Sequence, residues 1–148
     1  MSNLEFFSSP IGLGHVTRDI AIVNNLENIT TNFVTGSGAA KILKNLDFKV
    51  QDVYNPPSFI IKNGTLQNSA KWLWGYYKYY KDCKNISKKI IQADNPNSII
   101  SDEDFASLTV AQEMKIPTVL ITDVLETKFT SGRGLRIFSS SLTLGDLF

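Results

Sequence analysis

Short apolar segments alternate with segments of helical periodicity along most of the chain, and this alternation constrains the fold more than any other feature. The predicted strands cover 4–8, 32–35, 48–54, 98–101 and 117–122, and the predicted helices cover 15–27, 39–46, 69–93 and 105–114. A strand, a helix and a second strand in succession form a right-handed crossover between parallel strands. The pattern therefore predicts an α/β fold, specifically a Rossmann-like three-layer α/β/α domain with a mainly parallel sheet.

The chain length favours a single domain. The 148 residues match the commonest domain size, 43% of them are hydrophobic, and no linker, repeat or low-complexity segment divides them. We therefore expect one domain over residues 1–148. The segment after the fifth predicted strand contains Gly132 and Gly134 and ends on the apolar residues Leu147 and Phe148, whereas a natural terminus is more often polar. This tail predicts that the chain stops inside a longer domain or protein.

Charge and cysteine content exclude several classes of protein. Fifteen Lys and Arg against fourteen Asp and Glu leave a formal charge of +1, which is too small for a general nucleic-acid-binding field, so no nucleic-acid partner is expected. Cys83 is the only cysteine, which excludes an intramolecular disulfide and predicts a small buried side chain. The sequence also lacks a secretory leader and any apolar run long enough to span a membrane. These features predict a cytoplasmic protein.

The turn after the first predicted strand is the first candidate site, because ligands of such sheets bind outside the carboxyl ends of the strands. Gly12 and Gly14 let the backbone approach a ligand, and the N-terminus of the following helix attracts phosphate. The dinucleotide motif is incomplete, since Thr17 stands in place of its third glycine and the second strand ends at Gly36 without an acidic residue. A nicotinamide or flavin enzyme is therefore disfavoured. Ordinary turn chemistry is the alternative role for the two glycines.

His15 is the only histidine of the chain and lies at the start of the first predicted helix. The helix dipole there disfavours the imidazolium form, which suits a general base near neutral pH. Asp102 and Asp104 follow the fourth predicted strand, and a 3-2-1-4-5 strand order makes that strand the neighbour of the first. His15 and Asp102 can then interact. Helix capping is the alternative role for both aspartates.

Two segments resemble a known family. Residues 8–26 contain a Gly-x-Gly-His-x-x-Arg core, and residues 99–119 begin with Ile-Ile-Ser-Asp and end with Ile-Pro-Thr-Val. Together they are similar to the N-terminal domain of GT-B glycosyltransferases, in particular to the MurG-like and UDP-glycosyltransferase-like group. The resemblance implies a single GT-B half, which holds the acceptor, and a C-terminal donor-binding domain that this chain does not contain.

The resemblance also implies a reaction. His15 matches the histidine that takes the proton from the acceptor hydroxyl, and Asp102 matches the aspartate that orients it. The expected enzyme is an inverting, metal-independent hexosyltransferase with a nucleotide sugar, expected to be a UDP-sugar, as donor substrate and no cofactor. The residues expected to contact substrate or phosphate are Gly12, Gly14, Thr17, Arg18, Gly36 and Asp104. The donor-binding domain has to be supplied in cis or in trans, and the chain alone is expected to be inactive.

The long third predicted helix is strongly basic. Residues 71–91 carry six lysines against the single acidic residue Asp82, while the rest of the chain is acidic. Helical spacing places Leu73 in the core stripe and Trp74 with Lys78 and Lys81 on the exposed face. This composition is typical of a membrane-interface helix or of an acceptor surface, and a peripheral contact with anionic membrane at the inner face is one expectation. A solvated charged face is the alternative.

Two other function classes stay open. One is a non-catalytic binding or membrane-recruiting module of a split glycosyltransferase, with a sugar or lipid-linked acceptor as its natural partner. The other is a small flavodoxin-like ligand-binding protein. A second Rossmann-like segment with a donor-binding motif, in the same gene or its neighbour, favours the transferase, and its absence favours the module.

Overall fold

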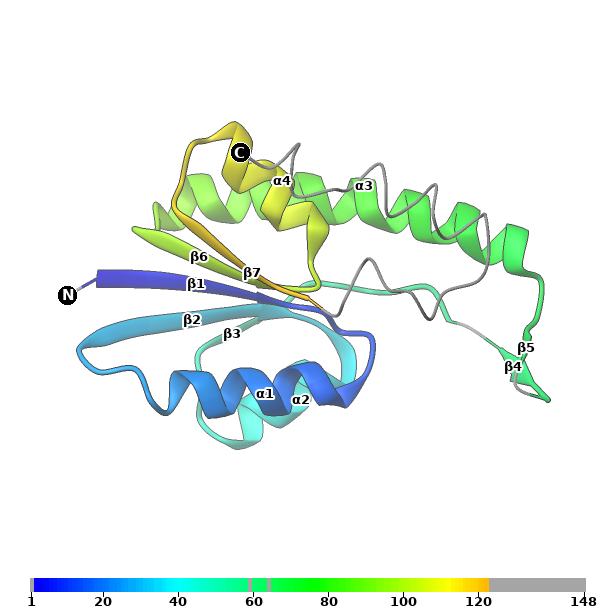
Figure 1. Ribbon diagram of the computed structural model, residues 1–148, viewed down its shortest axis with the longest axis horizontal. Coiled ribbons are helices and arrows are strands. Elements are labelled where there is room, and N and C mark those ends of the chain that lie inside the picture. The colour runs from blue at the N-terminus through cyan, green and yellow to red at the C-terminus, as the bar shows by residue number, and fades with distance from the viewer. Residues whose placement is uncertain (1, 59, 64, 123–148) are drawn as a thin grey trace, which may run out of the picture.

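The structure, a computed structural model, describes residues 2–58, 60–63 and 65–122, so the tail discussed above lies outside the described residues. The helices are α1 (Leu13–Val23), α2 (Ser37–Asn45), α3 (Ser69–Asp94) and α4 (Phe105–Glu113). The strands are β1 (Ser2–Ser8), β2 (Ile29–Thr35), β3 (Val50–Asp52), β4 (Ile61–Lys62), β5 (Thr65–Leu66), β6 (Ser98–Asp102) and β7 (Thr118–Ile121). In Figure 1, α1 and α2 cover one face of the sheet, and α3 and α4 cover the other. The predicted three-layer fold is therefore confirmed.

The main sheet has five strands in the order β3-β2-β1-β6-β7, and every neighbouring pair is parallel. This is the predicted 3-2-1-4-5 order for the strands of that sheet. The central strands β1 and β6 are in register so that Ser8 lies opposite Asp102. Their carboxyl ends therefore meet at the point where strand order reverses, which is where ligands of this architecture bind.

Consecutive apolar residues of the central strands face opposite layers. Phe6 and Phe33 belong to the core under α1 and α2, whereas Phe7, Val34 and Ile99 belong to the core under α3 and α4. A parallel sheet covered on both sides needs apolar residues on both faces, and this explains the unbroken apolar runs in the sequence. Each such fully buried side chain contributes about 1.5–3 kcal/mol to folding. The two cores hold the carboxyl ends of β1 and β6 in fixed positions.

Several element boundaries differ from the predicted ones. Helix α1 ends at Val23, before the predicted end, because the amides of Asn24, Asn25 and Leu26 form turn hydrogen bonds. The third strand is short, and the segment predicted as a loop contains the antiparallel β4–β5 pair. Leu73, predicted in the core stripe, is 51% exposed, so this prediction is wrong. It lies near the start of α3, where the helix has passed the sheet.

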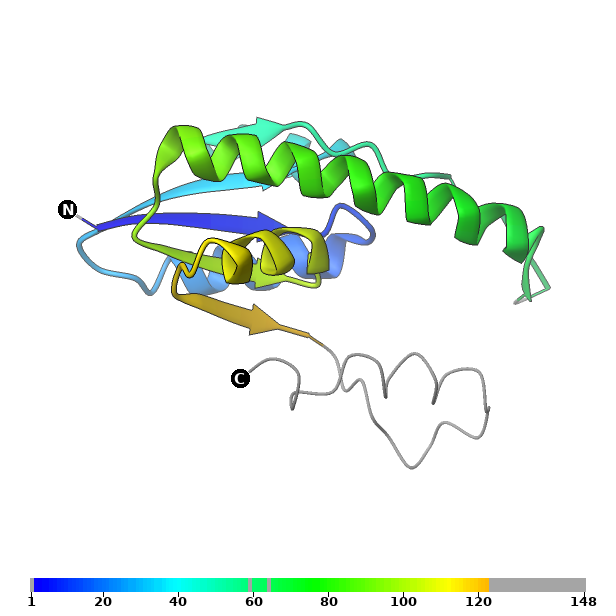
Figure 2. The same cartoon turned by 90° about the horizontal axis from the view of Figure 1, so that it is seen from above.

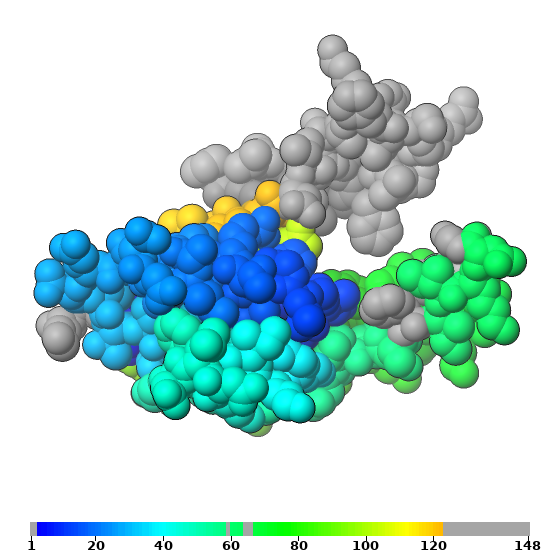
Figure 3. Space-filling model, turned by 90° about the horizontal axis from the view of Figure 1, so that it is seen from below, coloured from blue at the N-terminus to red at the C-terminus, as the bar shows by residue number. Residues whose placement is uncertain are grey.

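The first turns of α3 extend past the carboxyl ends of the strands. The helix has 26 residues, which corresponds to about 39 Å at 1.5 Å per residue. Figures 1 and 2 show its start, together with the β4–β5 hairpin, projecting beyond the sheet. In the space-filling view these green residues stand out at one end of the molecule (Figure 3). This overhang forms one wall beside the carboxyl ends of β1 and β6.

Candidate functional site

The turn between β1 and α1 is shaped by glycine. Gly12 precedes α1 with φ of 94°, a backbone conformation that side chains with a Cβ rarely adopt. Gly14 lies in the first turn of α1 and faces open space. The exposed start of α1 contains no acidic residue and leaves its first amides accessible. Contact of this turn with an anion or a phosphate stays a prediction.

Asp102 points toward α1 because of its place on β6. Ile100, two residues earlier, packs in the core under α1 and α2, and side chains two apart on a strand share a face. Asp102 is the last residue of β6 and is fully buried. Its carboxylate therefore meets the side chains of α1 at the end of the sheet rather than capping α4.

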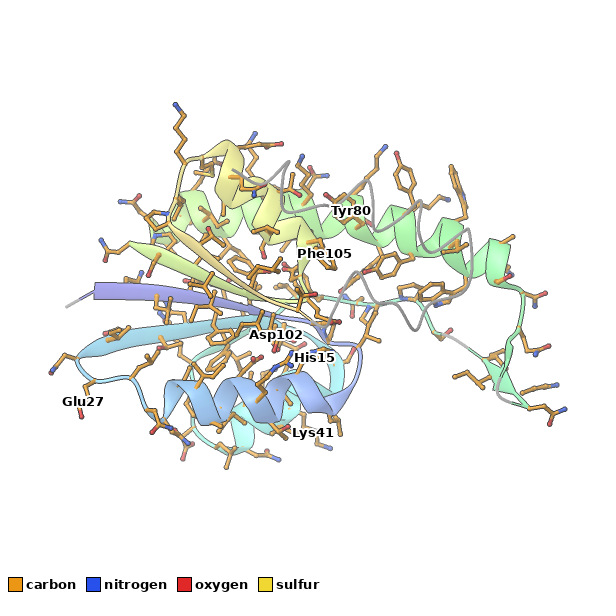
Figure 4. All side chains as sticks on the ribbon, in the orientation of Figure 1. His15, Glu27, Lys41, Tyr80, Asp102 and Phe105 are labelled. Atoms are coloured by element: carbon orange, nitrogen blue, oxygen red, sulfur yellow. The ribbon has the colours of Figure 1, made fainter. Side chains whose placement is uncertain are left out.

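His15 and Asp102 interact directly. The His15 Nδ1 atom lies 3.2 Å from Asp102 Oδ1, and the imidazole Nε2 lies 3.7 Å from an oxygen of Glu103. Figure 4 shows the two labelled side chains, His15 and Asp102, pointing toward each other between α1 and the sheet. The same Nδ1 lies 3.3 Å from Nη2 of Arg18, which can only donate. In the tautomer that donates from Nδ1 to the Asp102 carboxylate, the Nε2 lone pair is free to accept a proton. The contact predicted between these residues is confirmed.

Arg18 is the second basic side chain that contacts Asp102. Its Nε donates to Asp102 Oδ2 at 3.0 Å, and its Nη2 donates to Oδ1, the oxygen that also meets His15. Burial by itself raises the pKa of Asp102, but the hydrogen bonds from Arg18 and Asp19 and the charge of Arg18 lower it below its ordinary value. Asp102 is thus anionic at neutral pH. Arg18 was expected to contact phosphate, and in this structure its guanidinium is bound to Asp102.

Asp19 completes this cluster and was not predicted as a site residue. Its side chain is fully buried and lies against Asp102 and Ser8. Burial, together with the neighbouring Asp102 carboxylate, raises the pKa of Asp19 to about 8. The sequence does carry a signal, because Asp19 falls between Val16 and Val23 in the apolar stripe of α1, where a charged residue is unusual.

Asp104 has a structural role. Its carboxylate caps α4 by accepting from the Ala106 amide at 3.2 Å and from the Tyr54 hydroxyl at 2.8 Å. Tyr54 also bonds Ser87 on α3 at 2.7 Å, so the three side chains tie β3, α3 and α4 together. Burial raises the pKa of Asp104 despite these hydrogen bonds. The helix-capping interpretation therefore holds for Asp104, and a contact with substrate finds no support in this placement.

Gly36 and Thr17 also have local explanations. A Cβ on Gly36 would lie 1.8 Å from the Tyr54 carbonyl oxygen, so glycine is needed for a close backbone approach. Thr17 is exposed and donates to the Gly14 carbonyl at 2.9 Å. Within the described part of the chain, neither residue is hydrogen-bonded to the side chain of His15 or Asp102. A substrate contact by either one stays a prediction.

Two hollows border α3 near the site. A small one, beside the cluster, is lined by Pro10, Ile11, Tyr76, Glu103 and Phe105 among others. A larger one of about 520 Å³ lies between α3 and the segment that follows β3. Tyr79 and Cys83 line both, so the hollows adjoin along α3. Glu103 lines the small hollow and also lies 3.7 Å from His15 Nε2, so the hollow borders His15.

The outer face of α3 carries exposed aromatic and basic side chains. Trp74 is 60% exposed, as predicted, and its ring stacks on Tyr77 with centroids 5.7 Å apart. The Nζ atom of Lys78 lies 5.6 Å from the Trp74 ring, and that of Lys81 lies 4.9 Å from the Tyr77 ring. We call Trp74, Tyr77, Lys78 and Lys81 the aromatic–lysine surface. No helix in the described part of the chain is long and apolar enough to cross a membrane.

Comparisons with known proteins identify the architecture. No protein-family model and no curated protein matches the sequence. Among solved structures, the glycotransferase of kitacinnamycin has a TM-score of 0.63 at 10% identity, and the match covers 95% of this chain and 34% of that one. MurG from Acinetobacter baumannii has a TM-score of 0.60 at 9% identity, with 97% and 40% covered. UDP-GlcNAc 2-epimerase from Neisseria meningitidis has a TM-score of 0.58 at 16% identity, with 97% and 38% covered.

The chain thus spans well under half the length of these three proteins. Identities this low establish the fold and leave the reaction open, since glycosyltransferases and an epimerase share it. The chain has an α/β fold whose five-stranded parallel sheet, flanked by helices, matches one half of a GT-B-like protein.

Proposed function

We propose that this chain is the acceptor-binding half of an inverting, nucleotide-sugar-dependent hexosyltransferase. The observation that carries the proposal is the contact between His15 Nδ1 and Asp102 Oδ1 at 3.2 Å, placed at the switch point of a GT-B-like half. Asp102 is anionic and buried, so it can hold the imidazole in one orientation and stabilise its protonated form. The small hollow beside Glu103 is the proposed place of the acceptor hydroxyl.

The proposed step is a single displacement. The acceptor hydroxyl oxygen forms a bond to the anomeric carbon while its proton moves to His15 Nε2. The bond between the anomeric carbon and the diphosphate oxygen breaks, and its electron pair leaves with the nucleoside diphosphate. Attack from the face opposite the leaving group inverts the anomeric configuration. His15 then carries the proton, and Asp102 balances its charge.

The donor-binding site is the part of the proposed enzyme to which this chain contributes least. We propose a UDP-sugar as donor, a sugar or lipid-linked acceptor, and a donor-binding half supplied in cis or in trans. The glycine turn before α1 offers accessible amides near the sheet end, where a diphosphate of the donor can approach. The proposal is tested on a protein in which this chain is joined to a nucleotide-sugar-binding half. Sugar transfer that depends on His15 supports the proposal, and transfer unaffected by loss of His15 removes the residue from the mechanism.

A second function is favoured by the overhang of α3. We propose that the aromatic–lysine surface contacts anionic lipid, which would make the chain a membrane-recruiting module at the cytoplasmic face. Between Val53 and Lys81 the sequence has four lysines and no acidic residue. Ile60 and Ile61, next to the hairpin, are each 59% exposed. Exposed aromatic and aliphatic side chains among lysines suit the interface of a negatively charged bilayer.

Liposome sedimentation tests this surface. We expect the chain to bind vesicles that contain phosphatidylserine and to bind neutral phosphatidylcholine vesicles weakly. The double variant Lys78→Gln and Lys81→Gln should lose about 2 kcal/mol of binding free energy, because each lysine near an anionic surface contributes about 1 kcal/mol.

Matched controls separate this surface from the general charge of α3. Lys88→Gln with Lys89→Gln removes the same charge from exposed positions nearer the end of the helix and should change binding less. Trp74→Ala should weaken binding even at high salt, because its contribution is apolar. Equal partitioning of all variants between anionic and neutral vesicles would contradict the lipid contact and favour a solvated charged face.

A further inference from the structure

We propose that Asp19 is a positioning residue that keeps its proton at neutral pH and donates it to Asp102, so that the buried pair carries one negative charge rather than two. The pair lies beneath His15, between α1 and the end of β6. The consequence for proton acceptance by His15 rests on the proposed function. The protonation state itself does not, since it is a property of the chain alone.

Helix geometry brings the residues together. His15, Arg18 and Asp19 are three and four residues apart on α1, so their side chains lie on one face of the helix. That face meets Asp102, which is fully buried like Asp19. Both oxygens of Asp19 are buried, and neither accepts a hydrogen bond from a donor among the described residues. A carboxyl group in this position faces the Asp102 carboxyl group and is shielded from the solvent that would stabilise a charge.

The surrounding charges decide which acid is ionised. Asp102 contacts both basic side chains of this helix face. Arg18 donates to both of its oxygens, and His15 Nδ1 lies 3.2 Å from Oδ1. Two carboxylates in contact cannot both ionise at low cost, so the proton stays on the one with less compensation. That one is Asp19, whose pKa burial raises to about 8. From β1 the neighbour is the neutral Ser8 hydroxyl, and at the end of β6 the next charge is Glu103, which faces His15.

The proton on Asp19 has two effects. It supplies Asp102 with a further donor beside those of His15 and Arg18, which fixes the carboxylate that orients the imidazole. It also keeps a second anion away from His15.

Carboxyl-carbon NMR on the full chain tests the proposal. With ¹³C-labelled aspartate, we expect one carboxyl resonance to titrate near pH 8, far above the ordinary range for aspartate, and Asp19→Asn to remove that resonance. The exposed Asp82→Asn serves as the matched control and should leave it in place. Ionisation of Asp19 below pH 7, or assignment of the high-pH titration to Asp102, would overturn the proposal. The wild-type titration alone is decisive if the variant does not fold.

Two further readouts distinguish positioning from a purely structural role. His15 is the only histidine, so its ring signals are unambiguous, and they should report the ionisation of Asp19 near pH 8 as a change that Asp19→Asn abolishes. Stability should follow the same group. Because its pKa is higher in the folded chain, the wild type loses stability relative to Asp19→Asn as pH rises from about 4 to about 8. These measurements need no substrate, so their failure leaves the proposed transfer reaction untouched.

Discussion

Replacement of His15 by alanine is expected to lower kcat by about 10²–10⁴-fold in a protein that joins this chain to a nucleotide-sugar-binding half. The imidazole is the group placed to accept the acceptor proton, and its Nδ1 atom is held 3.2 Å from the anionic Asp102. Without it, the hydroxyl must attack while it still carries its proton. Binding of the nucleotide sugar should remain unchanged, because His15 acts on the acceptor. Steady-state kinetics and equilibrium dialysis of the donor measure the two quantities separately.

The matched control for this substitution is Ala21→Gln. Ala21 is exposed on α1 and lies away from the His15 cluster, so the change tests whether the helix tolerates substitution. Ala21→Gln should keep full turnover, and circular dichroism should show that both variants are folded. Equal turnover of wild type and His15→Ala would contradict the role of His15 as general base. Loss of donor binding in His15→Ala would instead place the imidazole at the nucleotide sugar.

Replacement of Gly36 by alanine is expected to lower the free energy of unfolding by about 3 kcal/mol or more. A Cβ at this position would lie 1.8 Å from the Tyr54 carbonyl oxygen and 2.6 Å from its carbon, so backbone must move. The two segments are held together because the Thr35 carbonyl accepts from the amides of Val53 and Tyr54 at 2.9 and 3.1 Å. Displacement of Tyr54 also disturbs its hydrogen bond to Asp104. Urea unfolding measures the loss.

Gly38→Ala is the control, since it makes the same chemical change two residues later. A Cβ on Gly38 would meet only the Leu13 side chain at 3.4 Å, an ordinary contact, and the residue lies inside α2. Alanine there should be neutral or stabilise the chain by up to about 1 kcal/mol. If Gly36→Ala keeps its stability and loses nucleotide-sugar binding, the glycine serves the ligand, as the sequence predicted, rather than the fold.

The sequence predicts the sheet well because apolar periodicity and parallel-sheet topology are strong constraints. The runs around Phe6, Phe33 and Ile99 have to be covered on both sides, and right-handed crossovers then allow few strand orders. Once β1 and β6 are neighbours, a residue at the start of α1 and one at the end of β6 must lie close together. The contact between His15 and Asp102 follows from topology and needs no knowledge of side-chain geometry.

The rest of the site depends on contacts that periodicity does not contain. Arg18 could serve a phosphate or a carboxylate, and only the position of Asp102 decides between them. The apolar periodicity of α1 places Asp19 on the buried face of the helix, but it cannot show that the neighbouring side chain carries a second carboxyl group. From the sequence, Gly36 is predicted only to contact substrate or phosphate, and the close approach of the Tyr54 carbonyl, which requires glycine here, cannot be read from local sequence. From the sequence, either aspartate near the end of β6 could cap α4, yet Asp104 does so and Asp102, the last residue of the strand, does not.

The reaction itself is the most direct test of the central claim, because the same fold half occurs in glycosyltransferases and in a UDP-GlcNAc 2-epimerase. The measurement is ¹H NMR of the anomeric protons while the complete protein consumes a UDP-sugar in the presence of a hydroxyl acceptor. We predict release of one UDP for each new glycoside, with inverted anomeric configuration and dependence on His15. Conversion of the UDP-sugar into its epimer, with no glycoside formed, would contradict the account.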